Sequence, residues 1–172
     1  MQRRTLIRLG LAGTAVLAVA GTGAVLWRPG LRGAQLSPRG RSVMQACARA
    51  LLAGSLPGQP AAADTAIAAC MDRVDAAIGA LPPATRSELS QLLALLASPP
   101  GRRWFARLEA DWPAARTEQV HSALQSMRFD ARAIRQQAYH ALRELVHAAY
   151  FSDPSVWAAI GYPGPAALPA AS

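Results

Sequence analysis

Residues 131–150 read ARAIRQQAYHALRELVHAAY, and this stretch decides the fold class. Its apolar residues recur every three or four positions, which is the spacing of one face of an α-helix. The face consists of Ile134, Ala138, Ala141, Leu142, Leu145 and Ala149. Asp130 stands just before the run, where its side chain suits a helix cap. The pattern therefore predicts a long helix from about Ala131 to Tyr150.

Five shorter stretches with the same spacing come before it. Their apolar stripes are Val43, Cys47, Ala50 and Leu51; then Ile67, Met71, Val74 and Ile78; then Leu89, Leu92, Leu93 and Leu96; then Trp104, Leu108 and Trp112; then Val120, Leu124 and Met127. Prolines and glycines separate the stripes and predict helices over 61–79 and 84–97, with Ser98 as the next cap and Pro113 opening the fifth helix. Six helices joined by short loops predict an all-α protein, a small antiparallel helical bundle over residues 41–165.

The composition agrees with this fold class and limits the function. The chain has 172 residues, the length of one domain, and 52% of them are hydrophobic, which is enough for a core. Only 6% are aromatic and alanine is abundant, which favours helices. Its formal net charge is +8, and every basic residue is arginine. The arginines that follow residue 27 are spread over several predicted helices instead of forming one run. We therefore expect a solvated basic surface and no nucleic-acid site.

Residues 1–27 have the pattern of a twin-arginine export signal. Adjacent Arg3 and Arg4 are followed after one position by Leu6, Ile7 and Arg8, and then by a mildly apolar, Gly- and Ala-rich run over residues 9–27. A signal of this kind predicts a periplasmic protein that the twin-arginine translocase exports already folded. The apolar run is also about long enough to span a bilayer. Two fates therefore stay open, namely cleavage of the leader and retention of residues 9–27 as an anchor in the inner membrane.

The segments on either side of the bundle carry little periodic pattern. Residues 28–40 are rich in Pro, Gly and Arg and are predicted to be a linker. Residues 166–172 are predicted to be a disordered tail.

Cys47 and Cys70 are the only cysteines and lie on consecutive predicted helices around the turn at 54–60. In an antiparallel pair of helices, the two cysteines would stand at similar levels along the helix axes. Because the periplasm is oxidising, a disulfide between them is one interpretation. The other is two buried thiols that pack as small apolar residues. The sequence leaves both open.

Candidate chemical groups are few. His140, Glu144 and His147 share one helix face, which gives at most a weak two-ligand metal site, and surface histidines are the simpler interpretation. No nucleophile stands with a base, and no glycine-rich phosphate loop follows a strand. We therefore expect no catalytic, cofactor-binding or metal-binding residues in this chain.

The most distinctive part of the mature chain is YFSDPSVWAAIGYPGP, residues 150–165. It concentrates Tyr150, Phe151, Trp157 and Tyr162, and Tyr162 is held extended by the proline after it. A rigid segment with aromatic anchors loses little entropy on binding. Tyr150, Trp157, Tyr162 and Pro163 are therefore candidate partner-binding residues. In the alternative interpretation, Trp157 and Tyr162 fold back over the chain's own bundle.

The twin-arginine start and the ending at residues 150–164 resemble the gluconate 2-dehydrogenase subunit 3-like proteins, small subunits of membrane-associated flavin dehydrogenases of the glucose–methanol–choline type. Between the two ends the likeness is one of helical pattern and length. The resemblance implies a non-catalytic helical subunit that travels with a large flavoprotein dehydrogenase subunit and aids its export, maturation or attachment. It implies FAD in that partner, with any haem in a further chain, and offers no catalytic residues to transfer. The competing hypotheses are a stand-alone, membrane-tethered binding protein and an enzyme in its own right.

Overall fold

Proline stands at the first position of four of the helices, where its missing N–H costs nothing and its fixed φ suits the helix. In the computed structural model, which describes residues 28–162, these helices are α3 (Pro38–Leu51), α4 (Pro60–Gly79), α5 (Pro83–Ala97) and the single turn α6 (Pro99–Gly101). They are followed by α7 (Thr117–Arg128) and α8 (Ala133–Phe151). The prediction of an all-α protein is confirmed, with six α-helices in the part that the structure describes.

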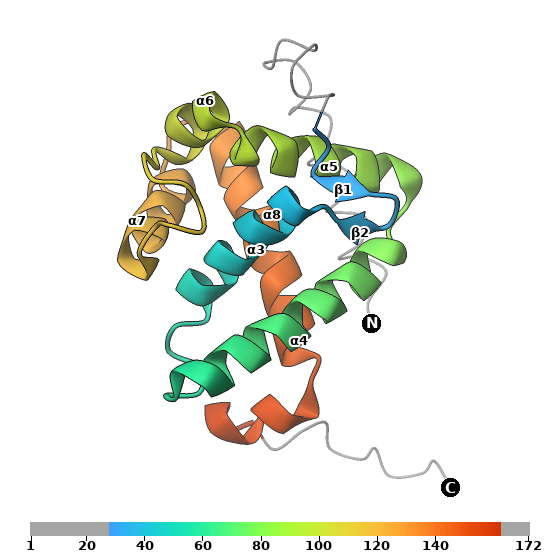
Figure 1. Cartoon of the computed structure of the whole chain (residues 1–172), viewed down its shortest axis with the longest axis vertical. Helices are drawn as coiled ribbons and strands as arrows, with labels where there is room; N and C mark the ends of the chain where they lie inside the picture. The colour runs from blue at the N-terminus through green and yellow to red at the C-terminus, as the bar shows by residue number, and fades with distance from the viewer. Residues whose placement is uncertain (1–27, 163–172) are drawn as a thin grey trace, which may run out of the picture.

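Helix α3 is the centre of the arrangement (Figure 1). It packs against α4, α5, α7 and α8, whereas the other helices contact fewer neighbours. Half of its residues are buried, among them Gly40 and the small Ala46, Ala48 and Ala50. Because small side chains let helix backbones approach closely, four helices can pack around α3. Val43, Met44 and Cys47 of α3 are completely inaccessible and lie in the core.

Most of the predicted linker is folded, which corrects the assignment of residues 28–40, and α3 already begins at Pro38. Leu31–Arg32 (β1) and Gln35–Leu36 (β2) form a two-stranded antiparallel hairpin whose turn uses Gly33 at a φ of +62°. The backbone N–H of Leu36 donates to Asp75 Oδ1 over 2.7 Å, and that of Leu31 donates to Ser90 Oγ over 3.1 Å. The hairpin is thereby fixed to α4 and α5. Strands of two residues are too short to show alternation in a sequence.

The predicted fourth helix, with Trp104, Leu108 and Trp112 on one face, is wrong. After α6 the chain makes one π-helical turn, Arg102–Ala106 (η2), and Arg107 then takes the left-handed conformation at a φ of 55°. The chain continues without a helix until Thr117, so the prediction that Pro113 opens the fifth helix is wrong as well. Leu108 and Trp112 are buried, while Trp104 faces outward.

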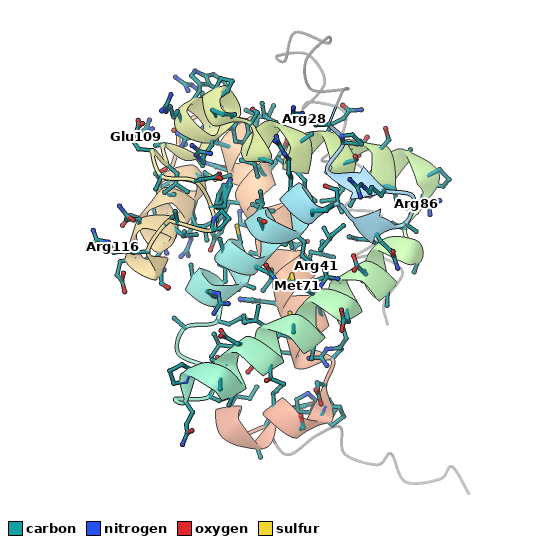
Figure 2. All side chains as sticks on the ribbon, viewed as in Figure 1. Arg28, Arg41, Met71, Arg86, Glu109 and Arg116 are labelled. Atoms are coloured by element: carbon teal, nitrogen blue, oxygen red, sulfur yellow. The ribbon has the colours of Figure 1, made fainter. Side chains whose placement is uncertain are left out.

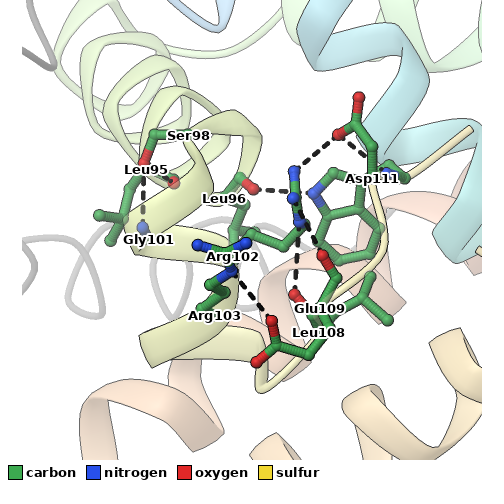
Figure 3. Close-up of polar contacts among 10 residues, drawn as sticks. Leu95, Leu96, Ser98, Gly101, Arg102, Arg103, Leu108, Glu109 and Asp111 are labelled. Atoms are coloured by element: carbon green, nitrogen blue, oxygen red, sulfur yellow. Dashed lines mark hydrogen bonds and ion pairs between the residues drawn. The ribbon is translucent and has the colours of Figure 1, made fainter.

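The side chain of Arg102 holds this non-helical segment (Figure 3). It lies 7% exposed, and its guanidinium donates to the carbonyls of Leu108 and Glu109 and, over 2.7 Å, to Asp111 Oδ1. Trp112 Nε1 donates to the carbonyl of Leu96 over 2.7 Å. Backbone groups that a helix would satisfy internally are therefore satisfied by one arginine.

The C-terminal segment leaves α8 through two short 3₁₀ turns, Pro154–Val156 (η3) and Ala158–Ile160 (η4). Asp153 caps the first by accepting from the N–H of Ser155, and Gly161 ends the second at a φ of +71°. The prediction that Asp130 caps the long helix is wrong, because the cap residue of α8 is Arg132, and Asp130 accepts from its N–H over 2.9 Å. Over residues 28–162, no helix combines the length and the apolar character needed to cross a bilayer.

Candidate partner-binding surfaces

Large apolar side chains are exposed in two places within the described part of the chain. Ile160 and Tyr162, each 47% exposed, belong to the C-terminal segment. Trp104 and Phe129, at 49% and 74%, lie near the start of α8. Exposed aromatic groups of this size mark candidate interaction sites. We call the first site, with Trp157, Ile160 and Tyr162, the C-terminal surface, and the second, with Trp104, Arg107, Arg128, Phe129 and Arg132, the arginine–aromatic surface.

The C-terminal surface is held in place by contacts to α4 and to the end of α8. Arg73 of α4 donates from Nε to the carbonyl of Ala149 over 2.7 Å and from a terminal nitrogen to Asp153 Oδ2 over 3.1 Å. The Ser155 hydrogen bonds, followed by the charge of Arg73, lower the pKa of Asp153 below its usual value. The carboxylate therefore stays ionised and keeps the segment attached to α4.

The aromatic side chains of this surface pack on each other as well as on the chain. Trp157 is half-buried, and its Nε1 donates to the carbonyl of Phe151 over 2.8 Å. The ring of Tyr162 meets Trp157 edge-on, with the ring centroids 5.3 Å apart. Trp157 is thus turned back toward α8, while Tyr162 and Ile160 remain available to another molecule.

Of the predicted partner-binding residues, Tyr150 is buried and Pro163 lies outside the described residues. Tyr150 is only 2% exposed, and its hydroxyl donates to the carbonyl of Ser55 over 2.7 Å. It is a core residue that joins α8 to the turn after α3, which corrects its assignment to a binding surface. Pro163 lies outside the described residues, as do the export-signal residues Arg3, Arg4, Leu6, Ile7 and Arg8 and the apolar run 9–27.

The arginine–aromatic surface is built on a buried ion pair. Arg135 is completely inaccessible, and its guanidinium pairs with the carboxylate of Asp130. It also donates to the carbonyl of Phe105 over 2.6 Å and to Ser126 Oγ over 3.0 Å. One side chain of α8 therefore joins the π-helical turn, α7 and the α7–α8 connection. Burial lowers the pKa of Arg135, and the charge of Asp130 opposes this effect.

The exposed residues of this surface form two arginine–aromatic stacks on the solvent side of the buried ion pair. The guanidinium carbon of Arg132 lies 5.5 Å from the ring centroid of Trp104, and that of Arg128 lies 4.9 Å from the ring centroid of Phe129. A recess of about 430 Å³ opens beside them, lined by Arg107, Ser126, Phe129, Asp130, Ala131 and Arg132. This surface was not predicted from the sequence, although Arg128, Phe129 and Arg132 stand together at a predicted helix boundary.

Both cysteines are free thiols in the structure, and both are inaccessible. Burial raises the pKa of Cys47 to about 12 and that of Cys70 to about 11, with the charge of Arg73 opposing the second shift. The Sγ of Cys70 lies 3.8 Å from the carbonyl oxygen of Val146. The structure thus has the buried-thiol arrangement and not the disulfide.

We expect both thiols of the native chain to react with iodoacetamide at least about a hundredfold more slowly than a free cysteine, because the thiolate is the reactive form and burial suppresses it. In denaturant, without reductant, both should react fully. Mass spectrometry counts the labels. Full labelling that requires reductant even in denaturant would instead establish a Cys47–Cys70 disulfide.

The histidines do not form a metal site with their neighbours. Within residues 28–162, no group of three His, Cys, Asp or Glu side chains is placed to hold a metal ion. His140 and Glu144 are exposed, and His147 packs edge-on against Phe151. Burial, aided by the charge of Arg143, lowers the pKa of His147 and keeps it neutral at pH 7.

Two smaller pockets, of about 180 and 290 Å³, lie on the two sides of Trp112 and Pro113. Of their charged residues, Arg102 binds Asp111 and Arg49 binds Asp64 over 2.6 Å. Figure 2 shows Arg28, Arg86, Glu109 and Arg116 on the outside of the molecule, while Met71 lies in the core. Within the described residues, the two exposed apolar surfaces are therefore the strongest candidate sites.

Comparison of the chain with protein-family models, with curated proteins and with solved structures finds no match.

Proposed function

We propose that this chain is a non-catalytic accessory subunit of an exported, membrane-associated flavin-dependent dehydrogenase. In this role it aids the export, maturation or attachment of a large catalytic subunit, which carries the FAD. The observation that carries the proposal is the C-terminal surface, a segment fixed by Arg73 that leaves Ile160 and Tyr162 exposed. It coincides with the part of the sequence that resembles the small subunits of such enzymes.

The arrangement of the chain supports a role between a membrane and a partner. Arg28, which directly follows the apolar run 9–27, lies at one end of the long axis of the molecule, and η3 and η4 lie at the other (Figures 1 and 2). A chain delivered or held by its leader in the inner membrane therefore directs the C-terminal surface away from the bilayer. This is the position that a large periplasmic partner can reach.

Co-purification tests the proposal. A C-terminally tagged chain, extracted from fresh membranes in mild detergent, is expected to bring down a large polypeptide and the visible absorbance of a bound flavin. Intact mass spectrometry of the complex gives its composition. Recovery of the chain as a monomer without flavin would contradict the proposal and favour a stand-alone, membrane-tethered binding protein.

Replacing Trp157 with alanine should weaken the complex about thirtyfold or more, the scale of an aromatic hot spot. The change removes the ring that packs edge-on against Tyr162 and that donates from Nε1 to the carbonyl of Phe151. Complex yield in a detergent dilution series measures the effect.

Tyr162→Ala should weaken the complex without altering the bundle, because Tyr162 lies at the exposed end of the described segment, and Tyr162→Phe should retain most of the affinity. The thermal unfolding midpoint of the isolated variants controls for damage to the fold. An undiminished yield for both Trp157→Ala and Tyr162→Ala would show that this surface is not the anchor.

A further inference from the structure

The arginine–aromatic surface is distinct from the C-terminal surface in sequence and in place. Trp104 comes from the π-helical turn, Arg128 and Phe129 come from the end of α7, and Arg132 precedes α8. Trp104 and Phe129 are 49% and 74% exposed. Nothing in the function proposed above uses these residues.

Its two outer arginines are fixed without a carboxylate. Arg128 and Arg132 are exposed, and neither forms an ion pair within 4.0 Å in residues 28–162. Each guanidinium instead lies over an aromatic ring, Phe129 or Trp104. A stacked guanidinium keeps its donor edge free, and its planar fork matches the two oxygens of a carboxylate. The two arginine side chains are therefore already partly immobilised, which lowers the entropy cost of binding a carboxylate.

The carboxylate already in the cluster is occupied. Asp130 accepts from Arg135, from Arg107 over 3.4 Å and from the N–H of Arg132. The last hydrogen bond is the main cause that lowers the pKa of Asp130, so the group is ionised at neutral pH. Three arginines (Arg107, Arg132 and Arg135) therefore act on one carboxylate, and Arg128 adds a further positive charge to the surface. The excess positive charge complements an acidic ligand.

We propose that this surface binds an acidic segment of a partner protein. The carboxylates of the segment pair with Arg128 and Arg132, and an apolar side chain next to them enters the recess of about 430 Å³ against Phe129. Anionic phospholipid offers the same charge, but a bilayer surface presents its charged headgroups alone. The room for an apolar side chain beside Arg132 and Phe129, together with the excess positive charge, favours an acidic peptide.

A peptide selection on the purified full chain in detergent micelles tests this inference. Peptides from a random displayed library are selected on the immobilised chain, synthesised with a fluorescent label, and their Kd is measured by anisotropy. We expect the selected peptides to contain adjacent Asp or Glu residues with a neighbouring apolar residue. The double variant Arg128→Gln and Arg132→Gln should weaken their binding about tenfold or more, as should Phe129→Ala.

Matched variants separate recognition from general charge. Arg143→Gln removes one exposed arginine of α8 that has no ion pair among the described residues, and it should leave the Kd unchanged. The double variant Arg128→Lys and Arg132→Lys keeps the charge but loses the planar fork, and it should bind less tightly than the native chain.

Three results would overturn the inference. The first is a selection that yields no acidic peptide. The second is an equal loss of affinity in Arg143→Gln. The third is binding to phosphatidylglycerol vesicles that depends on Arg128 and Arg132 while no acidic peptide competes, since this would make the surface a lipid contact. All variants change exposed side chains, and their thermal unfolding verifies the fold.

Discussion

Replacing Arg135 with alanine is expected to lower the free energy of unfolding by about 3–5 kcal/mol, the cost of removing one partner of a buried ion pair. Arg135 is completely inaccessible and joins Asp130, Ser126 and the carbonyl of Phe105. Without the guanidinium, the carboxylate of Asp130 loses its buried cation, and the carbonyl of Phe105 and Ser126 Oγ lose their hydrogen-bond donor. Urea denaturation followed by tryptophan fluorescence measures the difference.

The control is Arg143→Ala, which removes an exposed arginine of the same helix and should change stability by less than about 0.5 kcal/mol. A loss below about 1 kcal/mol for Arg135→Ala would mean that the ion pair does not hold the π-helical turn and α7 together.

Acid titration adds a second readout for this pair. The pKa of Asp130 is lowered in the folded chain, first by the N–H of Arg132 and then by Arg135. Its contribution to stability is therefore complete above the usual carboxyl pKa of about 4 and is lost as the pH falls through the lowered folded value. The difference between wild type and Arg135→Ala should accordingly narrow at low pH.

Changing Arg3 and Arg4 together to lysine is expected to abolish export of the chain and of any partner subunit that lacks its own signal. Lysine keeps both charges, so the orientation rule that governs an ordinary membrane anchor is still satisfied. Loss of export therefore identifies the twin-arginine route specifically. Fractionation and immunoblotting of a tagged chain measure it, with the flavin content of the periplasmic and membrane fractions as the second readout.

Arg28→Lys is the matched control, since it changes an arginine on the other side of the apolar run, and export should be normal. Wild-type levels of the doubly substituted chain outside the cytoplasm would leave a plain membrane anchor as the interpretation of residues 1–27.

The sequence predicted those parts of the fold whose stability comes from an uninterrupted apolar face. The helices predicted over 61–79 and 84–97 occur at Pro60–Gly79 and Pro83–Ala97, and the long helix from Ala131 occurs at Ala133–Phe151. In the first two, periodicity and the position of proline agree, and in the third the long apolar face suffices, so local and tertiary preferences coincide.

Where a side chain replaces backbone hydrogen bonds, periodicity fails. Trp104, Leu108 and Trp112 have helical spacing, yet Arg102 binds the carbonyls of the following segment and keeps it non-helical. The hairpin at Leu31–Leu36 depends on Asp75 and Ser90, which are distant in sequence. Neither contact leaves a local signal.

In the candidate sites too, local features could be predicted from the sequence, whereas contacts between distant segments could not. Asp153 as a cap follows from its position before Pro154, and exposure of Tyr162 agrees with the prediction of an accessible aromatic segment. Tyr150 was assigned to that surface by composition, although it lies one turn after Val146 and so shares its buried face. Trp104 and Arg132 meet through tertiary packing, to which the hydrogen bond from Arg135 to the carbonyl of Phe105 contributes. Single-sequence patterns carry no information on such an encounter.

The central position of α3 has a consequence for how the chain gains and loses structure. Four helices share α3 as their common neighbour, so the core that they bury together is incomplete until α3 is in place. Such an arrangement makes unfolding all-or-none, without a stable half-folded species. Under the export route proposed above, in which the translocase carries folded proteins, the docking of this one helix would therefore decide whether the chain can be exported.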